Sequence, residues 1–159
     1  MIAKHVSRKR KNDDYGRLAQ YIADAPEKGE KCLVIWSAGC WSGDDYGTGI
    51  VEAKNTQGMN TRSAKEKTYH LIVSFRPEDE AKLTPEAFKA IEERFAQALG
   101  FAEHQRHCGV HKNTNNLHLH VAYNMYSKVK FCIVQYDTIF LLFQYIIKTI
   151  KASQSNKDH

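Results

Sequence analysis

Three histidines in the second half of the chain have the spacing of a metal-ligand set. In a strand, residues two apart project from the same face, so His118 and His120 should lie side by side, about 7 Å apart along the backbone. The turn-rich segment KNTNN precedes them and predicts a hairpin that brings His111 against both. Three converging imidazoles with open positions are typical of a catalytic metal site, where the ion acts as a Lewis acid on a phosphate or carbonyl oxygen.

The same histidines allow other interpretations. Surface histidines on a solvated strand face are the alternative to a metal site. A nucleotide-hydrolase pattern needs a third alternating histidine, and position 122 is Ala122. A two-histidine phosphoesterase needs His-x-Thr or His-x-Ser twice, and neither copy is present.

The elements that must position these residues follow from local patterns. The clearest strand is TYHLIVSF, which is rich in β-branched and aromatic residues. Acceptor side chains at 12–14 can cap a helix that runs to about residue 24, and Pro85 opens a second helix. Residues 38–60 are ambiguous, with a short helix around 50–55. We expect an α+β fold with flanking helices and a central, mainly antiparallel sheet of five strands: 2–6, 31–37, 68–75, 105–111 and 117–124.

Composition describes a globular, basic chain. It has 159 residues, of which 42% are hydrophobic, and a net charge of +5, which disfavours disorder and favours an anionic partner such as nucleic acid or a membrane surface. Candidate phosphate contacts, with an ordinary solvated surface as the alternative, are Arg8, Lys9, Arg10, Lys11, Arg62, Lys65 and Lys67. Candidates for stacking on bases, or else for core packing, are Trp36, Trp41 and Tyr69.

The remaining features concern the cellular compartment and a membrane span. Four cysteines form no CxxC pair and indicate reduced thiols, and MIAKHVSRKRK lacks the apolar core of a signal peptide, so we expect a cytoplasmic protein. The apolar segment 131–150 approaches the length of a membrane span, but polar residues, among them Asp137 and Lys148, interrupt it and favour a buried or misplaced helix.

Several segments resemble plasmid relaxases. In this order, MIAKHV, LAQYIAD, NTRSAKEKTYHLIVSFR and GFAEHQRHCGVHKNTNNLHLHVAYN are similar to the nicking domain of IncP TraI-like relaxases, in the P-type mobilisation family of HUH endonucleases. The resemblance covers residues 1–126. Residues 127–159 diverge from the family into an apolar tail, which suggests a truncated or frame-shifted product.

The resemblance implies roles for particular residues. It makes Tyr21 the nucleophile, and Ser74 a contact to DNA beside the nick. The metal ligands are His111, His118 and His120, and His118 also helps to activate the tyrosine. Asn124 completes an HxHxxxN pattern and orients either a neighbouring residue or the DNA.

The implied function is strand-specific nicking at a plasmid transfer origin through a 5′-phosphotyrosine adduct. The implied ion is Mg²⁺ or Mn²⁺, although imidazoles alone prefer softer ions such as Zn²⁺. Implied partners are single-stranded origin DNA, relaxosome accessory proteins and a coupling protein. Two alternatives stay open: an inactive DNA-binding remnant, and a different metal phosphoesterase in which Tyr21 only packs.

Overall fold

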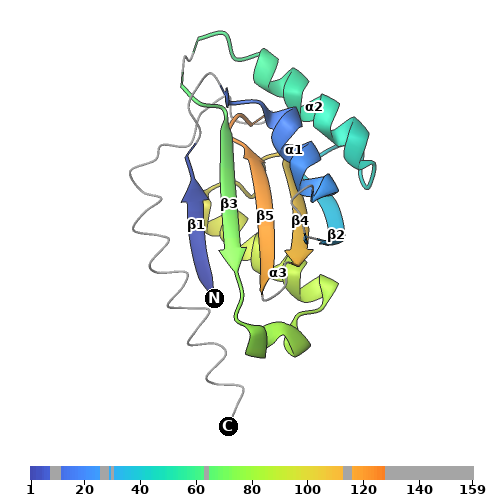
Figure 1. Ribbon diagram of the computed structural model, residues 1–159. Coiled ribbons are helices and arrows are strands. Elements are labelled where there is room, and N and C mark those ends of the chain that lie inside the picture. The colour runs from blue at the N-terminus through green and yellow to red at the C-terminus, as the bar shows by residue number, and fades with distance from the viewer. Residues whose placement is uncertain (8–11, 26–28, 30, 63–64, 113–115, 128–159) are drawn as a thin grey trace.

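The fold is built on one antiparallel sheet. The computed structural model describes residues 1–7, 12–25, 29, 31–62, 65–112 and 116–127. Its strands are β1 (Ile2–Val6), β2 (Lys31–Ala38), β3 (Thr68–Ser74), β4 (Arg106–Lys112) and β5 (Leu117–Asn124). They pair in the order β1-β3-β5-β4-β2, each antiparallel to its neighbour (Figure 1). The predicted α+β class and five-stranded sheet are therefore confirmed.

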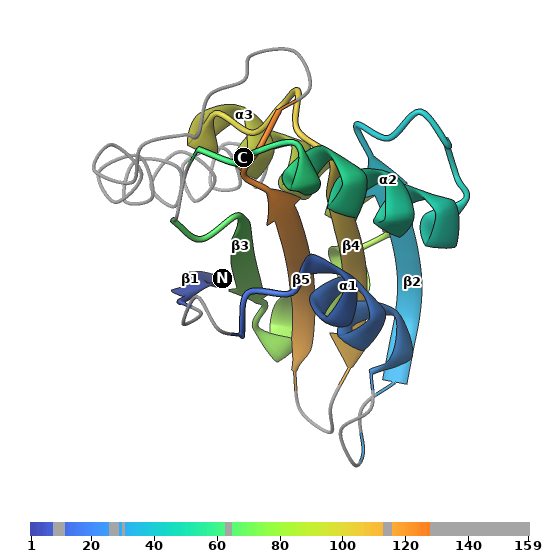
Figure 2. The same cartoon turned by 90° about the horizontal axis from the view of Figure 1, so that it is seen from above.

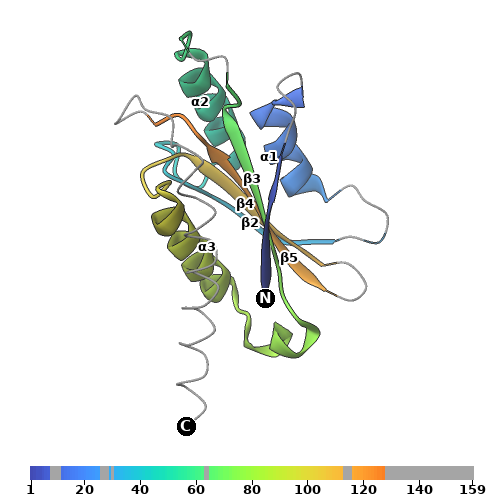
Figure 3. The same ribbon diagram turned by 90° about the vertical axis from the view of Figure 1, so that its left-hand side faces the viewer.

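Helices cover both faces of this sheet. They are α1 (Tyr15–Asp24), α2 (Tyr46–Gly58), the 3-10 helix η2 (Pro77–Lys82) and α3 (Pro85–Leu99). Figure 3 shows α1 and α2 on one side of the sheet and α3 on the other. Seen from above, α1 lies over β5 and β4 rather than over β1 and β3 (Figure 2). The described helices and the sheet therefore form three layers.

The face under α3 carries the larger apolar core. Phe88, Phe95 and Leu99 recur at helical spacing and pack with inward residues of the strands, such as Val110 and Leu119. A buried ion pair also joins the layers, because Nε of Arg106 on β4 lies 2.7 Å from a carboxylate oxygen of Glu92 on α3. The Tyr123 hydroxyl donates to the same carboxylate at 3.2 Å.

Helix α2 is longer than the sequence predicted. We expected a helix around 50–55, but α2 begins at Tyr46, because the Asp45 carboxylate accepts hydrogen bonds from the Thr48 backbone N–H at 2.9 Å and its hydroxyl at 2.7 Å. At the other end, the Lys67 ammonium donates to the carbonyl oxygens of Gln57 and Asn60. The glycines of the first turn concealed this helix, since glycine lowers helix propensity.

Several expectations concern residues that the structure describes only in part. Cys32, Cys40 and Cys108 are free thiols. In the described part of the chain, no helix is long and apolar enough to cross a membrane. The apolar segment 131–150 and nearly all of the expected tail 127–159 lie outside the described residues, so their predictions stay untested.

Candidate active site

The strand register gathers the three histidines on one face of the sheet. His111 on β4 pairs directly with His118 on β5, and His120 follows by strand alternation. The rings of His111 and His120 stack with their centroids 4.4 Å apart, and the centroids of His118 and His120 are 6.3 Å apart. The hairpin expected from the sequence therefore brings the rings together, beneath α1.

Tyr21 lies against this cluster from the helix side. Its ring centroid is 5.9 Å from that of His111 and 6.0 Å from that of His120, and the residue is half-buried. The other tyrosine of α1 is placed differently: Tyr15 is 1% exposed, and its hydroxyl lies 2.8 Å from Nδ1 of His107. Tyr21 is thus the tyrosine of α1 that combines partial exposure with contact to the histidine cluster.

A glycine allows α1 to approach the sheet this closely. A Cβ atom on Gly109 of β4 would lie 2.6 Å from Cγ2 of Ile22 and 2.9 Å from its carbonyl oxygen. The close approach lets Nε2 of His111 donate to that carbonyl oxygen at 2.6 Å. The same turn of helix therefore fixes His111 and presents Tyr21.

Two side chains of β3 complete the cluster. Ser74 pairs with His118 in the register, and its Oγ lies 3.0 Å from Nδ1 of His118. Nε2 of His70 lies 3.3 Å from Nδ1 of His120. His70 was not among the residues predicted for the site, although strand alternation in TYHLIVSF places it on the same face as Ser74.

Burial keeps the central imidazole neutral. The pKa of His120 falls to about 3, first because burial penalises the charged ring and then because His111, His70 and His118 lie nearby. At neutral pH the ring therefore keeps a lone pair, which is the form that binds metal ions.

The donor set fits a divalent cation by its chemistry. Within the described ranges, no group of three or more His, Cys, Asp or Glu side chains stands in an arrangement that could hold a metal ion as placed. Each ring nevertheless has one nitrogen within hydrogen-bond distance of a neighbouring group, as metal-binding histidines usually do. The bonds pair His111 with Ile22, His118 with Ser74, and His120 with His70.

Comparison with known proteins gives this site a family. The family described as "Relaxase: MobA/VirD2-like, nuclease domain" matches residues 21–154. The chain belongs to the MobA/VirD2-like relaxases. Among curated proteins, two called "Protein TraI" from Escherichia coli match over 125 residues each, one at 43% and the other at 44% identity. Each match covers 78% of this relaxase chain.

The relatives are much longer than this chain. The matches cover 16% and 17% of their lengths, so the chain spans about a sixth of each. No solved structure matches. The relaxase resemblance seen in the sequence is confirmed. The predicted division at residue 126 stays a prediction, since the family match runs to residue 154.

Asn124 sits apart from the relaxase histidine cluster. It is the last residue of β5, fully buried, and its Nδ2 donates to Oε1 of Gln105 at 3.0 Å. Its Oδ1 accepts from the backbone N–H of Tyr126 at 2.9 Å. Asn124 therefore bonds to neighbouring protein groups, and its role toward a neighbouring residue or the DNA stays a prediction.

The predicted DNA-contacting residues are spread over the relaxase. Arg62 is exposed in the connection between α2 and β3, whereas Arg8, Lys9 and Arg10 lie outside the described residues. Trp36 and Tyr69 are buried in the core, and Trp41 is 88% exposed. Trp41 is therefore the exposed one of these three aromatics, and base stacking by its ring stays a prediction.

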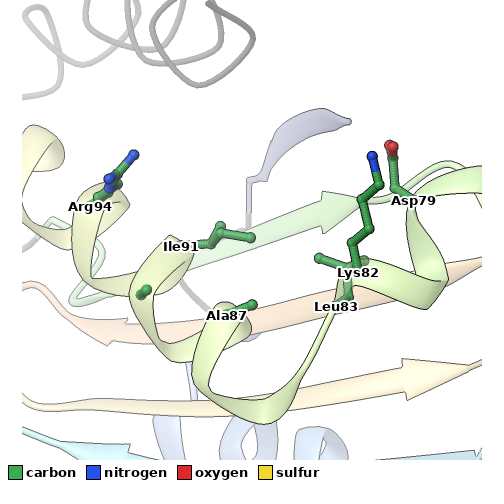
Figure 4. Close-up of a pocket in the computed structure, with 7 residues that line it drawn as sticks. Asp79, Lys82, Leu83, Ala87, Ile91 and Arg94 are labelled. Carbon is green, nitrogen blue, oxygen red and sulfur yellow. The ribbon is translucent and has the colours of Figure 1, made fainter. Parts of the chain in front are cut away.

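A hollow on the opposite side of the sheet is not part of this site. It lies between η2 and α3, and its lining includes Asp79, Lys82, Leu83 and Arg94 (Figure 4). Helix α3 covers the face opposite α1, so the sheet separates this hollow from Tyr21 and the histidines (Figure 3).

Proposed function

We propose that this relaxase chain nicks one strand of DNA at a plasmid transfer origin of the IncP type, using Tyr21 as the nucleophile. The phenolic oxygen attacks the scissile phosphorus, the bond from phosphorus to the 3′-oxygen breaks, and a 5′-phosphotyrosine bond forms. The phenol loses its proton and the departing 3′-oxygen gains one. The 3′-hydroxyl can later reverse the reaction and reseal the strand. The supporting observation is the placement of Tyr21 against His111 and His120.

The histidines supply the electrostatic part of this proposal. His111, His118 and His120 are the residues that would hold a divalent cation, Mg²⁺ or Mn²⁺. When bound, such an ion polarises the phosphate and offsets the charge of the transition state. His118 is the half-buried member of the three and takes the additional role of helping to activate the Tyr21 phenol, whose ordinary pKa is near 10.

DNA contacts in the proposal come from several places. Ser74, beside His118, contacts the strand next to the nick, and Arg62 with the basic residues Arg8, Lys9 and Arg10 binds phosphates. Relaxosome accessory proteins and a coupling protein are proposed partners, as for conjugative DNA transfer.

The decisive experiment looks for the covalent intermediate. The full chain is incubated with a single-stranded oligonucleotide from the nick region of an IncP transfer origin and Mg²⁺ or Mn²⁺, then resolved on a denaturing gel. We expect a protein–DNA adduct that is lost in Tyr21→Phe and in the presence of chelator. Tyr15→Phe is the matched control, because Tyr15 is the other tyrosine of the same helix and its adduct should persist.

Two outcomes would contradict the proposal. DNA binding without an adduct under either metal would indicate the inactive remnant considered above. Cleavage that survives Tyr21→Phe would indicate a phosphoesterase in which Tyr21 only packs.

A further inference from the structure

A fourth imidazole stands behind the histidine cluster. His70 lies in the middle of β3, is 4% exposed, and has its ring centroid 5.5 Å from that of His120. Its Nε2 and Nδ1 of His120 are 3.3 Å apart, within reach of a hydrogen bond. The register explains the contact, because Ile72 pairs with His120 and His70 is the next residue of β3 on that face.

The direction of this hydrogen bond decides what His120 can do. One neutral imidazole must donate and the other must accept. When Nδ1 of His120 donates, its lone pair lies on Nε2, and the ring can act as a ligand through that atom. When Nδ1 accepts, Nε2 carries the hydrogen and cannot bind a cation.

His111 provides an unambiguous parallel within the same cluster. Its Nε2 lies 2.6 Å from the Ile22 carbonyl oxygen, which can only accept, so Nε2 of His111 carries the hydrogen and the lone pair lies on Nδ1. A backbone group thus sets the tautomer of one ring. At His120 the group that can set the tautomer is instead a side chain, that of His70.

We propose that His70 is a positioning residue whose Nε2 accepts the Nδ1–H of His120 and thereby fixes the tautomer in which His120 offers Nε2 to a divalent cation. This inference rests on the proposed function, since the cation is part of it. His70 acts through His120 and carries its own hydrogen on Nδ1. Outer-shell partners of this kind orient a ligand and typically change metal affinity by about 10–100-fold when removed.

The first test reads the tautomer directly. The full chain is labelled with ¹⁵N-histidine and studied without metal at neutral pH by long-range ¹H–¹⁵N NMR, with His120 assigned by comparison with His120→Gln. We expect the hydrogen of His120 on Nδ1. A hydrogen on Nε2 of His120 would overturn the proposal, and the tautomer itself is measured on the wild-type chain.

The second test measures Mn²⁺ binding by calorimetry. His70→Phe keeps a ring but no acceptor, and should weaken binding by about 10–100-fold. His70→Gln restores an acceptor oxygen and should recover most of the affinity. His5→Phe is the matched control, because that imidazole stacks on Tyr69 with centroids 4.0 Å apart and belongs to the other face of the sheet.

The outcomes separate this inference from the nicking proposal. Equal losses of Mn²⁺ affinity in His70→Phe and His70→Gln would overturn it, because packing alone would then explain the effect. A wild-type chain that binds no Mn²⁺ would also overturn it. An absent Tyr21 adduct, with Mn²⁺ bound and Nδ1 of His120 protonated, would instead remove the nicking proposal and leave the role of His70 intact.

Discussion

At the scale of single residues, the two tyrosines of α1 differ in burial, and this difference decides which phenol is suited to act as a nucleophile. Tyr15 is enclosed, with its hydroxyl between Nδ1 of His107 and the carbonyl oxygen of Ala122, and burial raises its pKa well above the ordinary value. A phenol held in this way is a poor nucleophile, because its ionised form is strongly disfavoured. Tyr21, six residues later, is half-buried and packs against imidazoles.

Besides the proposed DNA contact, the hydroxyl of Ser74 is placed to hold the His118 ring, and one experiment can separate the two roles. Its hydroxyl lies 3.0 Å from Nδ1 of His118, so Ser74→Ala should loosen that ring. A neutral hydrogen bond contributes about 1 kcal/mol, which corresponds to a roughly fivefold slower adduct-forming step at saturating DNA. Ser74→Thr keeps the hydroxyl and should retain most of the rate. The rate is measured by quenched single-turnover assays, alongside DNA affinity by fluorescence anisotropy. An unchanged rate with weaker affinity would leave Ser74 with DNA contact alone.

Asn124 shows which part of the site could be predicted from residue spacing. Strand alternation puts His118 and His120 on one face, and by the same rule Asn124 follows on it. It cannot say what covers each end of that face. In the structure the amide of Asn124 is enclosed beside α2, with Nδ2 3.4 Å from the carbonyl oxygen of Ala53, while the histidines lie near Tyr21. Residue spacing within a strand predicts the face on which a side chain lies. It does not predict which helix, from a distant part of the sequence, packs over that side chain.

At the scale of elements, the approach of α1 to β4 decides where Tyr21 lies. Nothing local to LAQYIAD specifies that distance, since the residue that permits it is Gly109, far along the chain. Local patterns therefore predict the helix and the strand but not the contact between them. The predicted length of α2 was too short for a local reason. Its glycines lower helix propensity, whereas the capping carboxylate of Asp45 lets the helix begin at Tyr46.

Gly109→Ala tests this contact. The added methyl group would meet Cγ2 of Ile22 at 2.6 Å and its carbonyl oxygen at 2.9 Å, so α1 must shift outward. We expect a loss of about 1–3 kcal/mol in unfolding free energy, typical of overpacking. Because the shift also moves Tyr21 and the carbonyl that holds His111, adduct formation should fall by more than the loss of folded protein explains. Urea unfolding and the adduct assay on the same samples measure both effects.

A second glycine provides the matched control for that substitution. A Cβ atom on Gly58, at the end of α2, would meet nothing within 4 Å. Gly58→Ala should therefore leave adduct formation unchanged and stabilise the chain slightly, by up to about 1 kcal/mol. If Gly109→Ala behaves like Gly58→Ala, close packing of α1 is not what positions Tyr21.

At the scale of the whole molecule, the sheet divides two kinds of interior. The α3 face is apolar and supplies most of the core, while the α1 face buries imidazoles, among them His70, His107, His111 and His120. Burying a titratable ring is favourable only while it stays neutral and hydrogen-bonded. The chemistry of the α1 face should therefore make folding sensitive to acid, with the α3 core holding the molecule together at neutral pH.

Among the imidazoles outside the proposed ligand set, His107 is the most deeply buried. Its pKa gives the direction and the magnitude of the expected acid sensitivity of folding. The pKa of His107 falls to about 4, chiefly because burial penalises the charged ring, although the Tyr46 carbonyl and Glu52 favour that form. The folded pKa lies below the unfolded value of about 6.5, so this contribution to stability is complete above pH 6.5 and is lost as the pH falls toward 4. The pKa of His120 shifts in the same direction.

The unfolding free energy of the full chain, measured in urea, should thus drop between pH 7 and pH 4.5, with about 2–3 kcal/mol of the drop due to His107. His107→Gln cannot titrate and should show a drop smaller by that amount, even if it is less stable at pH 7. Equal drops in the two proteins would mean that His107 titrates normally in the folded chain, and that burial on the α1 face does not set the acid limit of this fold.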